Sequence, residues 1–95
     1  MSIKEILKNP KVKIIDVRSA MEFQGGHVVG SINIPLNEIP QKVSEIKCME
    51  GPLVLCCAAG ARSGQAIYFL QEQGVKDLHN GGGWMDVQWA QNSES

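Results

Sequence analysis

Apolar positions along the chain alternate between the spacing of strands and the spacing of helices. Residues 12–17 and 52–57 are rich in β-branched and other aliphatic side chains, which is typical of buried strands. Shorter apolar stretches at residues 31–34, stopped by Pro35, and at residues 77–79 predict two weaker strands. Because a helical pattern lies between successive strands, the sequence predicts a parallel sheet with helices on both faces and right-handed crossovers.

Capping signals predict where two short helices begin. Ser2 with Glu5, and Ser19 with Glu22, each have the spacing of a capping box. Pro10 follows the first of these helices and is expected to end it, because proline cannot continue the helical hydrogen-bond ladder.

Three further helices are expected later in the chain. Asn37 is a candidate N-cap for a helix that tolerates Pro40 in its first turn. A longer helix should begin near Arg62 and end at Gly74, where a glycine suits the position after a helix. Residues 84–89 predict a last turn or two of helix.

Composition and charge narrow the class of protein. The 95 residues suffice for one domain, assigned to residues 1–90, and the polar residues 91–95 are expected to form a disordered tail. Nine basic and ten acidic residues give a net charge of −1, so no basic stripe is present for nucleic acid. No apolar run is long enough to span a bilayer, and the N-terminus lacks the unbroken apolar stretch of a signal peptide, so we expect a cytoplasmic protein.

The cysteines at positions 48, 56 and 57 indicate free thiols. An odd number of cysteines without a signal peptide argues against a disulfide framework. Zinc is not expected either, because the chain has no C-x-x-C pair and His27 and His79 do not have ligand spacing.

Cys57 ends the strongest predicted strand and precedes a segment of small residues that leads to Arg62. Ligands bind at this end of the strands in open parallel sheets. Amide N–H groups of a tight loop, together with the start of the following helix, would favour a thiolate, which is the nucleophilic form. The alternative is a buried and inert cysteine followed by a glycine turn.

Three segments resemble, in order, the motifs of rhodanese-homology domains. The first reads Asp16-Val17-Arg18-x-x-x-Glu22-Phe23-x-x-Gly26-His27-Val28-x-Gly30-Ser31-Ile32-Asn33-Ile34-Pro35. The second, Cys57-x-x-Gly60-x-Arg62-Ser63-Gly64, looks like the family's active-site loop. The third, Asn80-Gly81-Gly82 before Trp84, is similar to its late glycine motif, and we interpret residues 80–83 as a loop. The resemblance implies an α/β three-layer sandwich with four to five parallel strands. Four is the number expected if the strand that many members carry before the first helix is missing.

The resemblance also implies a sulfurtransferase of the thiosulfate sulfurtransferase type. Cys57 would take a sulfane sulfur from thiosulfate or a persulfide, become a persulfide itself, and pass the sulfur to cyanide or a thiol. No metal or organic cofactor is required. The expected substrate-binding residues are Ala58, Ala59, Gly60, Ala61, Arg62 and Arg18. Expected partners are small-molecule donors and acceptors, thioredoxin, glutathione or a sulfur-relay protein, and the chain is expected to be a monomer.

Several of these residues have a structural alternative. Asp16, Arg18 and Glu22 are expected to form a structural polar network, with a place for Arg18 at the site mouth as the alternative. His27 resembles a family histidine that packs and bonds to the backbone. Arg62 either lines the pocket or ties down the start of its helix, and Trp84 is expected in the core or at the pocket rim.

Two other function classes remain open at this point. A phosphatase or arsenate reductase on the same fold would have a loop one residue longer, which is the count from Cys56 to Arg62. Gly60 fits the shorter sulfurtransferase pattern counted from Cys57, and Leu55 stands where a phosphatase would usually have histidine. A non-catalytic or sulfur-carrier module is the other alternative, and the presence of Cys57 disfavours a non-catalytic one.

Overall fold

Four parallel strands form the centre of the computed structural model, which describes residues 2–93. The strands lie in the order β2-β1-β3-β4 and span Ile32–Asn33, Lys13–Asp16, Leu53–Cys57 and Leu78–Gly83 respectively. Both inner strands, β1 and β3, are paired on each side, and every pairing is parallel. The predicted parallel sheet is confirmed, with four strands rather than five among the described residues.

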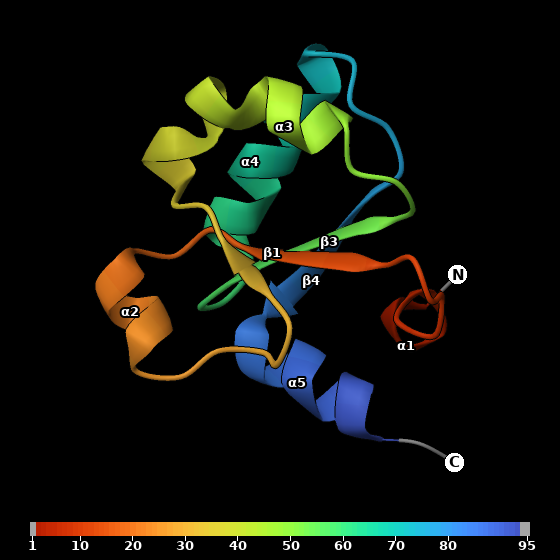
Figure 1. Cartoon of the computed structure of the whole chain (residues 1–95). Coiled ribbons are helices and arrows are strands. Elements are labelled where there is room, and N and C mark those ends of the chain that lie inside the picture. Colours follow the sequence, from red (N-terminus) through yellow and green to blue (C-terminus); the bar gives the residue numbers. More distant parts are fainter. Residues whose placement is uncertain (1, 94–95) are drawn as a thin grey trace.

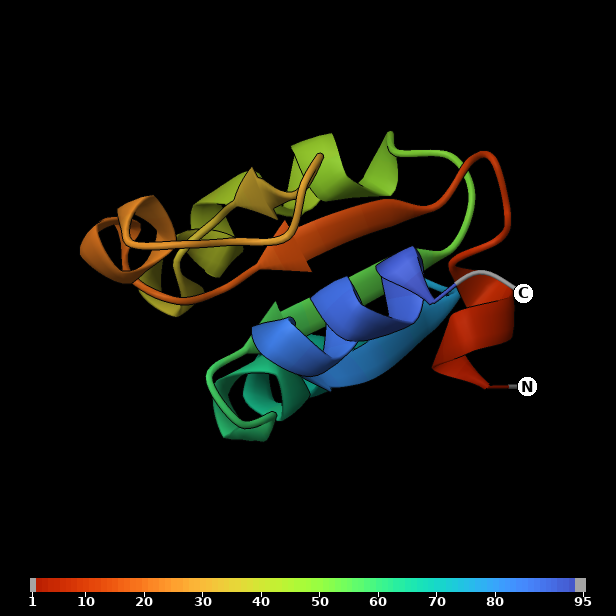
Figure 2. The same ribbon diagram turned by 90° about the horizontal axis from the view of Figure 1, so that it is seen from below.

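Helices cover both faces of this sheet, as Figure 1 shows. One face carries the 3₁₀ helix η1 (Leu36–Lys42), α3 (Val43–Lys47) and α4 (Ala61–Glu72). The other carries α1 (Ile3–Ile6) and α5 (Trp84–Asn92), and Figure 2 shows α5 running across it. The short helix α2 (Ala20–Gln24) follows the carboxyl end of β1 and lies beside that edge of the sheet.

Each face of the sheet has its own hydrophobic core. Ile15 and Leu55 point toward η1, α3 and α4, and join the larger cluster. Ile14 and Val54, one position earlier on the same two strands, point toward α1 and α5. This alternation follows from the two-residue period of a strand, and it explains why β3 is buried over its whole length.

The predicted ends of the helices are largely confirmed. Both capping boxes are present, at Ser2 and at Ser19. At the end of α4, Gly74 adopts a φ of +88°. The next amide, that of Val75, bonds back to the Leu70 carbonyl at 3.0 Å, as in a Schellman motif. The prediction for Asn37 is wrong, because Pro35 occupies the N-cap position and makes no side-chain cap.

The helix expected behind Asn37 is also of a different kind. Residues Leu36–Lys42 form a 3₁₀ helix, and regular α-helix begins only at Val43. Pro40 has no amide hydrogen to donate to the carbonyl of Leu36, which an α-helix starting at that residue would require. The segment therefore takes the tighter i→i+3 pattern before α3 begins.

The glycine run at residues 80–83 belongs to β4 and is not the predicted loop. Leu55 pairs with Asn80 and Cys56 pairs with Gly82, so Gly81 is the extra residue of a β-bulge. A Cβ atom on Gly81 would lie 2.6 Å from Cγ2 of Val87 and 2.9 Å from Cγ1 of Val54. Glycine at this position lets the edge strand pass close to β3 and α5.

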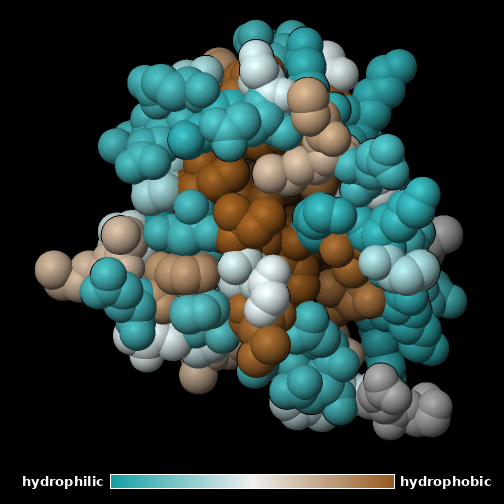
Figure 3. All heavy atoms as spheres, in the orientation of Figure 1, coloured by the Kyte–Doolittle hydropathy of each residue, from teal (hydrophilic) through white to brown (hydrophobic). Residues whose placement is uncertain are grey.

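The end of the chain also differs from expectation. Helix α5 includes Gln91 and Asn92, so the predicted polar tail does not begin at residue 91, and residues 94–95 lie outside the described part. Within residues 2–93, no helix combines the length and apolar character that crossing a membrane requires. Figure 3 shows apolar atoms gathered in the middle of the face where β2 lies in front of β1, framed by hydrophilic residues.

We predict that Gly81→Ala destabilises the fold by about 1–3 kcal/mol, because the added methyl group overpacks the contact with Val54 and Val87. Urea denaturation followed by circular dichroism measures the change. Gly25→Ala is the matched control, since Gly25 has a φ of −75° and a Cβ there meets nothing closer than 3.4 Å. Equal stability of the two variants would contradict the close packing at the bulge.

Candidate active site

Cys57 is the last residue of β3, and its side chain lies in the larger core cluster beneath α4. Cys56 belongs to the cluster on the opposite face of the sheet. Burial is the main reason why the pKa of Cys56 is raised, to about 12, with the charge of Asp16 adding to the effect. The two neighbouring thiols therefore occupy separate environments, as the strand period predicts.

The loop after Cys57 turns its backbone toward the sulfur. The amide of Gly60 donates a hydrogen bond to Sγ of Cys57 at 2.9 Å. Gly60 has a φ of +102°, and a Cβ there would lie 3.3 Å from Cα of Gly82. Both the left-handed conformation and the close approach of β4 favour glycine at this point of the motif. The remaining predicted contacts, Ala58, Ala59 and Ala61, are exposed around the loop.

Hydrogen bonds to the sulfur outweigh the effect of its burial. Burial alone raises the pKa of Cys57, since it disfavours the charged thiolate. Hydrogen bonds from the amide and hydroxyl of Ser63, and from the amides of Ala59 and Gly60, act in the opposite direction. The net result is a pKa lowered to about 7, so a large part of the thiol is ionised at neutral pH.

Two residues that belong to the family motifs, but to which the sequence assigned no role, complete the surroundings of Cys57. Ser63, in the first turn of α4, is fully buried, and its Oγ lies 3.6 Å from Sγ of Cys57. Asn80, on β4, accepts a hydrogen bond from that hydroxyl at 2.7 Å. Asn80 follows Leu78 by two residues, so in a strand the two side chains lie on the same face. This spacing could have placed Asn80 near the loop, but the glycine run made the segment look like a loop rather than a strand.

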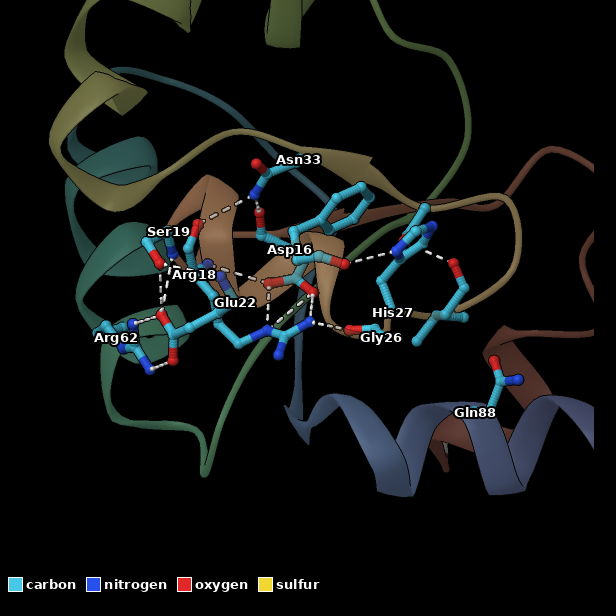
Figure 4. A network of polar contacts seen from close by, with 12 residues as sticks. Asp16, Arg18, Ser19, Glu22, Gly26, His27, Asn33, Arg62 and Gln88 are labelled. Atoms are coloured by element: carbon cyan, nitrogen blue, oxygen red, sulfur yellow. Dashed lines mark hydrogen bonds and ion pairs between the residues drawn. The ribbon is translucent and has the colours of Figure 1, made fainter.

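Arg18 is held away from solvent by a buried ion pair, and its exposed fraction is only 4%. Its Nη2 lies 2.7 Å from Oδ2 of Asp16 and donates to the Gly26 carbonyl at 2.7 Å (Figure 4). The guanidinium also stacks on Trp84, 4.8 Å from the ring centroid. These contacts favour a structural role for Arg18. Its contact with substrate stays a prediction.

Arg62 forms a second ion pair, beside the first in Figure 4. Its Nη1 and Nη2 lie 2.8 Å and 3.1 Å from the two carboxylate oxygens of Glu22. The hydrogen bonds from Arg62 and from the amide of Ser19 lower the pKa of Glu22 to about 2. The head of Arg62 thus ties the start of α4 to α2, and Glu22 pairs with Arg62 rather than joining Asp16 and Arg18 in a single network.

His27 has the packing role that the sequence suggested. Its Nδ1 lies 2.7 Å from the Phe23 carbonyl oxygen, and its ring stacks on that of Phe23 with centroids 3.7 Å apart. Trp84 is partly buried between Arg18 and Gly26, which is consistent with the expected core or rim position. Within residues 2–93 no group of three or more acidic, histidine or cysteine side chains is arranged to hold a metal ion.

The arrangement presents one ionisable sulfur to a ring of hydrogen-bond donors at the carboxyl end of a central strand. Such a sulfur is a nucleophile, and the same donors suit a second sulfur atom that carries negative charge. Both arginines near the loop are already paired with carboxylates, so the donors around the sulfur are mainly dipoles rather than free charges.

Comparison with known proteins places this arrangement in context. The rhodanese-like domain family matches residues 2–89. The chain is 38% identical over 74 residues to thiosulfate sulfurtransferase PspE of Escherichia coli, a match that covers 77% of this chain and 71% of that protein. It is 40% identical over 70 residues to the uncharacterized protein YqhL of Bacillus subtilis, covering 74% of this chain but only 55% of that longer protein.

A solved structure has the same architecture. The structure described as rhodanese with anions from E. coli superposes with a TM-score of 0.71 at 37% sequence identity, covering 79% of this chain and 89% of that one. The α/β architecture and the family expected from the motifs are therefore confirmed together.

We predict that alkylation of Cys57 by iodoacetamide has a pH midpoint near 7, because the hydrogen bonds at the loop keep the thiolate populated. The rate should rise as the pH passes upward through this value and then level off. The measurement uses a Cys48→Ser background, since Cys48 is exposed, and mass spectrometry to assign the label. A midpoint at the ordinary cysteine value of about 8.5 would contradict the loop's effect on the sulfur.

Proposed function

The chain belongs to the family of rhodanese-like domains, and from that membership we propose that it is a sulfurtransferase whose Cys57 carries the sulfur in transit. The single observation that carries the proposal is the sulfur of Cys57 facing the Gly60 amide at 2.9 Å. The lowered pKa of Cys57 supports the same role, because the thiolate is the attacking species.

The proposed reaction has two displacement steps. The Cys57 thiolate attacks the outer sulfur of thiosulfate or of a persulfide, and a bond forms between Sγ and that sulfur. The original S–S bond breaks, and its electron pair leaves with sulfite or with the donor thiolate. An acceptor thiolate or cyanide then attacks the outer sulfur of the Cys57 persulfide, and Sγ departs as a thiolate. The cycle leaves the oxidation state of Cys57 unchanged.

The residues around Cys57 have separate parts in this cycle. The amides of Ala59 and Gly60 would stabilise the thiolate in the resting enzyme and the charged outer sulfur in the persulfide. The small side chains at positions 58, 59 and 61 leave that outer sulfur accessible to an acceptor. Arg62 and Glu22 would hold the start of α4 in place while Cys57 gains and loses the transferred sulfur.

The phosphatase alternative would require the loop to be counted from Cys56. That thiol lies on the other face of the sheet, among residues of α1 and α5, and burial raises its pKa to about 12. A thiolate at Cys56 is therefore disfavoured at neutral pH and faces away from the loop amides. This placement supports sulfur transfer over phosphate chemistry.

The charges around the loop bear on the choice of donor. Thiosulfate carries two negative charges, yet Arg62 is paired with Glu22 and Arg18 with Asp16. A groove of about 350 Å³ borders Arg62 and is lined in part by Val17, Pro35 and Leu36. We therefore propose that a less charged donor, such as a low-molecular-weight or protein-bound persulfide, is preferred to thiosulfate. Glutathione, thioredoxin or a relay protein with a reactive thiol would be suitable partners.

We predict that Cys57→Ser abolishes sulfur loading, whereas Cys56→Ser retains most of it, because only Cys57 faces the loop donors. Intact-mass measurement after incubation with a donor detects the added sulfur, and peptide mapping locates it. Loading that survives in Cys57→Ser would overturn the assignment. Hydrolysis of an aryl phosphate that survives Cys57→Ser but is lost in Cys56→Ser would favour the phosphatase.

We predict that Ala58→Lys lowers the KM for thiosulfate several-fold, since one added charge near a partly exposed site contributes on the order of 1 kcal/mol. The KM for glutathione persulfide should change less, and the gain for thiosulfate should shrink as salt is added. Ala58→Met is the matched control, because it adds length without charge. If the native protein already binds thiosulfate tightly and Ala58→Lys changes nothing, the donor preference is wrong.

A further inference from the structure

Asn80 joins the edge strand β4 to the loop that surrounds Cys57. Its Nδ2 donates to the carbonyl of Gly60 at 3.1 Å, and its Oδ1 accepts from the hydroxyl of Ser63 at 2.7 Å. The amide of Gly82 also donates to Oδ1, at 2.9 Å. Gly60 lies in the loop after Cys57, and Ser63 lies in the first turn of α4. Gly82 belongs to the bulge of β4, which packs against that loop.

The orientation of the Asn80 amide is determined by its backbone partners. The N–H of Gly82 is a donor and must face the oxygen, whereas the carbonyl of Gly60 is an acceptor and must face the nitrogen. Oδ1 is therefore directed at Ser63 as well. The bulge at Gly81 makes this possible, because it brings Gly82 back against the side chain of Asn80.

The hydroxyl of Ser63 has one hydrogen but three acceptors within reach. Oδ1 of Asn80 lies at 2.7 Å, the carbonyl of Gly60 at 3.1 Å and Sγ of Cys57 at 3.6 Å. The contact with Asn80 has the ordinary length of an O–H···O hydrogen bond, so it holds the hydrogen when no charge competes. The oxygen of Ser63 then offers a lone pair to the S–H of Cys57.

We propose that Asn80 is a positioning residue for Cys57 and that it acts through the hydroxyl of Ser63. While Cys57 is a thiol, the hydroxyl of Ser63 donates its hydrogen bond to Oδ1 of Asn80. When the thiolate forms, the hydroxyl turns and donates to Sγ instead. The proposal deepens the proposed function, on which it rests only in taking Cys57 as the nucleophile.

The hydrogen-bond count is satisfied in each state. In the thiol, Cys57 donates to Ser63 and Ser63 donates to Asn80. When the thiol proton leaves to solvent, the hydroxyl rotates to the negative sulfur, and Oδ1 keeps its bond from the Gly82 amide. When sulfur is loaded, the charge moves to the outer sulfur, Sγ becomes neutral, and the hydroxyl hydrogen returns to Asn80. No buried polar group is left without a partner in any of these steps.

The other charges near Cys57 are the same in the native chain and in the Asn80 variants. Arg62 interacts with the charge of Cys57, and Asp86, in the first turn of α5, borders Gly83 beside the loop. Of the ionisable groups near Cys57, Arg62 is paired with Glu22, and Cys56 lies on the opposite face with a raised pKa. Asn80 itself is exposed, so a carboxylate placed there would remain ionised at neutral pH. Asn80→Asp therefore adds a strong acceptor for the Ser63 hydrogen and competes directly with the Cys57 thiolate.

The test is the pH profile of Cys57 alkylation in the Cys48→Ser background, which does not require sulfur transfer. Asn80→Asp should raise the midpoint by about half a pH unit or more, because the hydroxyl is drawn away from the thiolate. Asn9→Asp is the matched control. This substitution makes the same change of charge and keeps an acceptor for the Lys11 amide. Residue 9 lies beside Pro52, at the end of β3 opposite to Cys57, so the pH midpoint of Cys57 alkylation should not change.

The same pair of profiles in a Ser63→Ala background tests the route. If Asn80 acts through Ser63, the shift caused by Asn80→Asp falls to less than half when the hydroxyl is removed. An equal shift with and without Ser63 would mean a direct effect of charge and would overturn the proposal, as would no shift at all. Asn80→Ala is a second variant that adds no charge. It is expected to change the alkylation rate at neutral pH about threefold or more when Ser63 is present, and to leave the rate unchanged in the Ser63→Ala background.

Sulfur loading from a persulfide donor is measured in parallel by intact mass. If the native protein takes up no sulfur from the donor, the proposed function is contradicted, but the alkylation result for Asn80 is not affected. A shifted alkylation profile with normal Ser63 dependence would support the role of Asn80 whatever the physiological donor is.

Discussion

The left-handed backbone at Gly60 is the constraint on which the whole site depends. This one residue directs its amide at the sulfur of Cys57, and its carbonyl accepts from the side-chain amide of Asn80 and from the backbone amide of Gly64. It also occupies the N-cap position of α4, so the helix starts where the sulfur sits. Any side chain at this position would strain the turn and crowd β4, which would disturb the surroundings of Cys57 and the helix together.

Local signals in the sequence predicted most of the framework, because they act over a few residues. The capping boxes at Ser2 and Ser19, the buried strand that ends at Cys57 and the glycine after α4 each depend on neighbours in the chain. The family motifs then located the loop. The structure of the glycine run could not be predicted in this way, because β4 exists through its pairing with β3 and its contact with α5.

The polar partners of the site were hidden for the same reason. Arg62 meets Glu22 across 40 positions of sequence, and Ser63 meets Asn80 across 17. Neither distance follows from periodicity, since each depends on how separate elements pack. The consequence for the chemistry is that the sulfur is stabilised mainly by fixed backbone dipoles, while the nearby arginines keep the supporting helices in place.

The bulge at Gly81 has a consequence beyond the site. β4 is an edge strand, and a long regular edge offers unpaired backbone groups to which a strand from another molecule can add. The extra residue interrupts the repeat of β4, so its outer side is a less regular template for such pairing. The irregularity that places Gly82 against the side chain of Asn80 therefore also makes edge-to-edge pairing with another molecule less favourable.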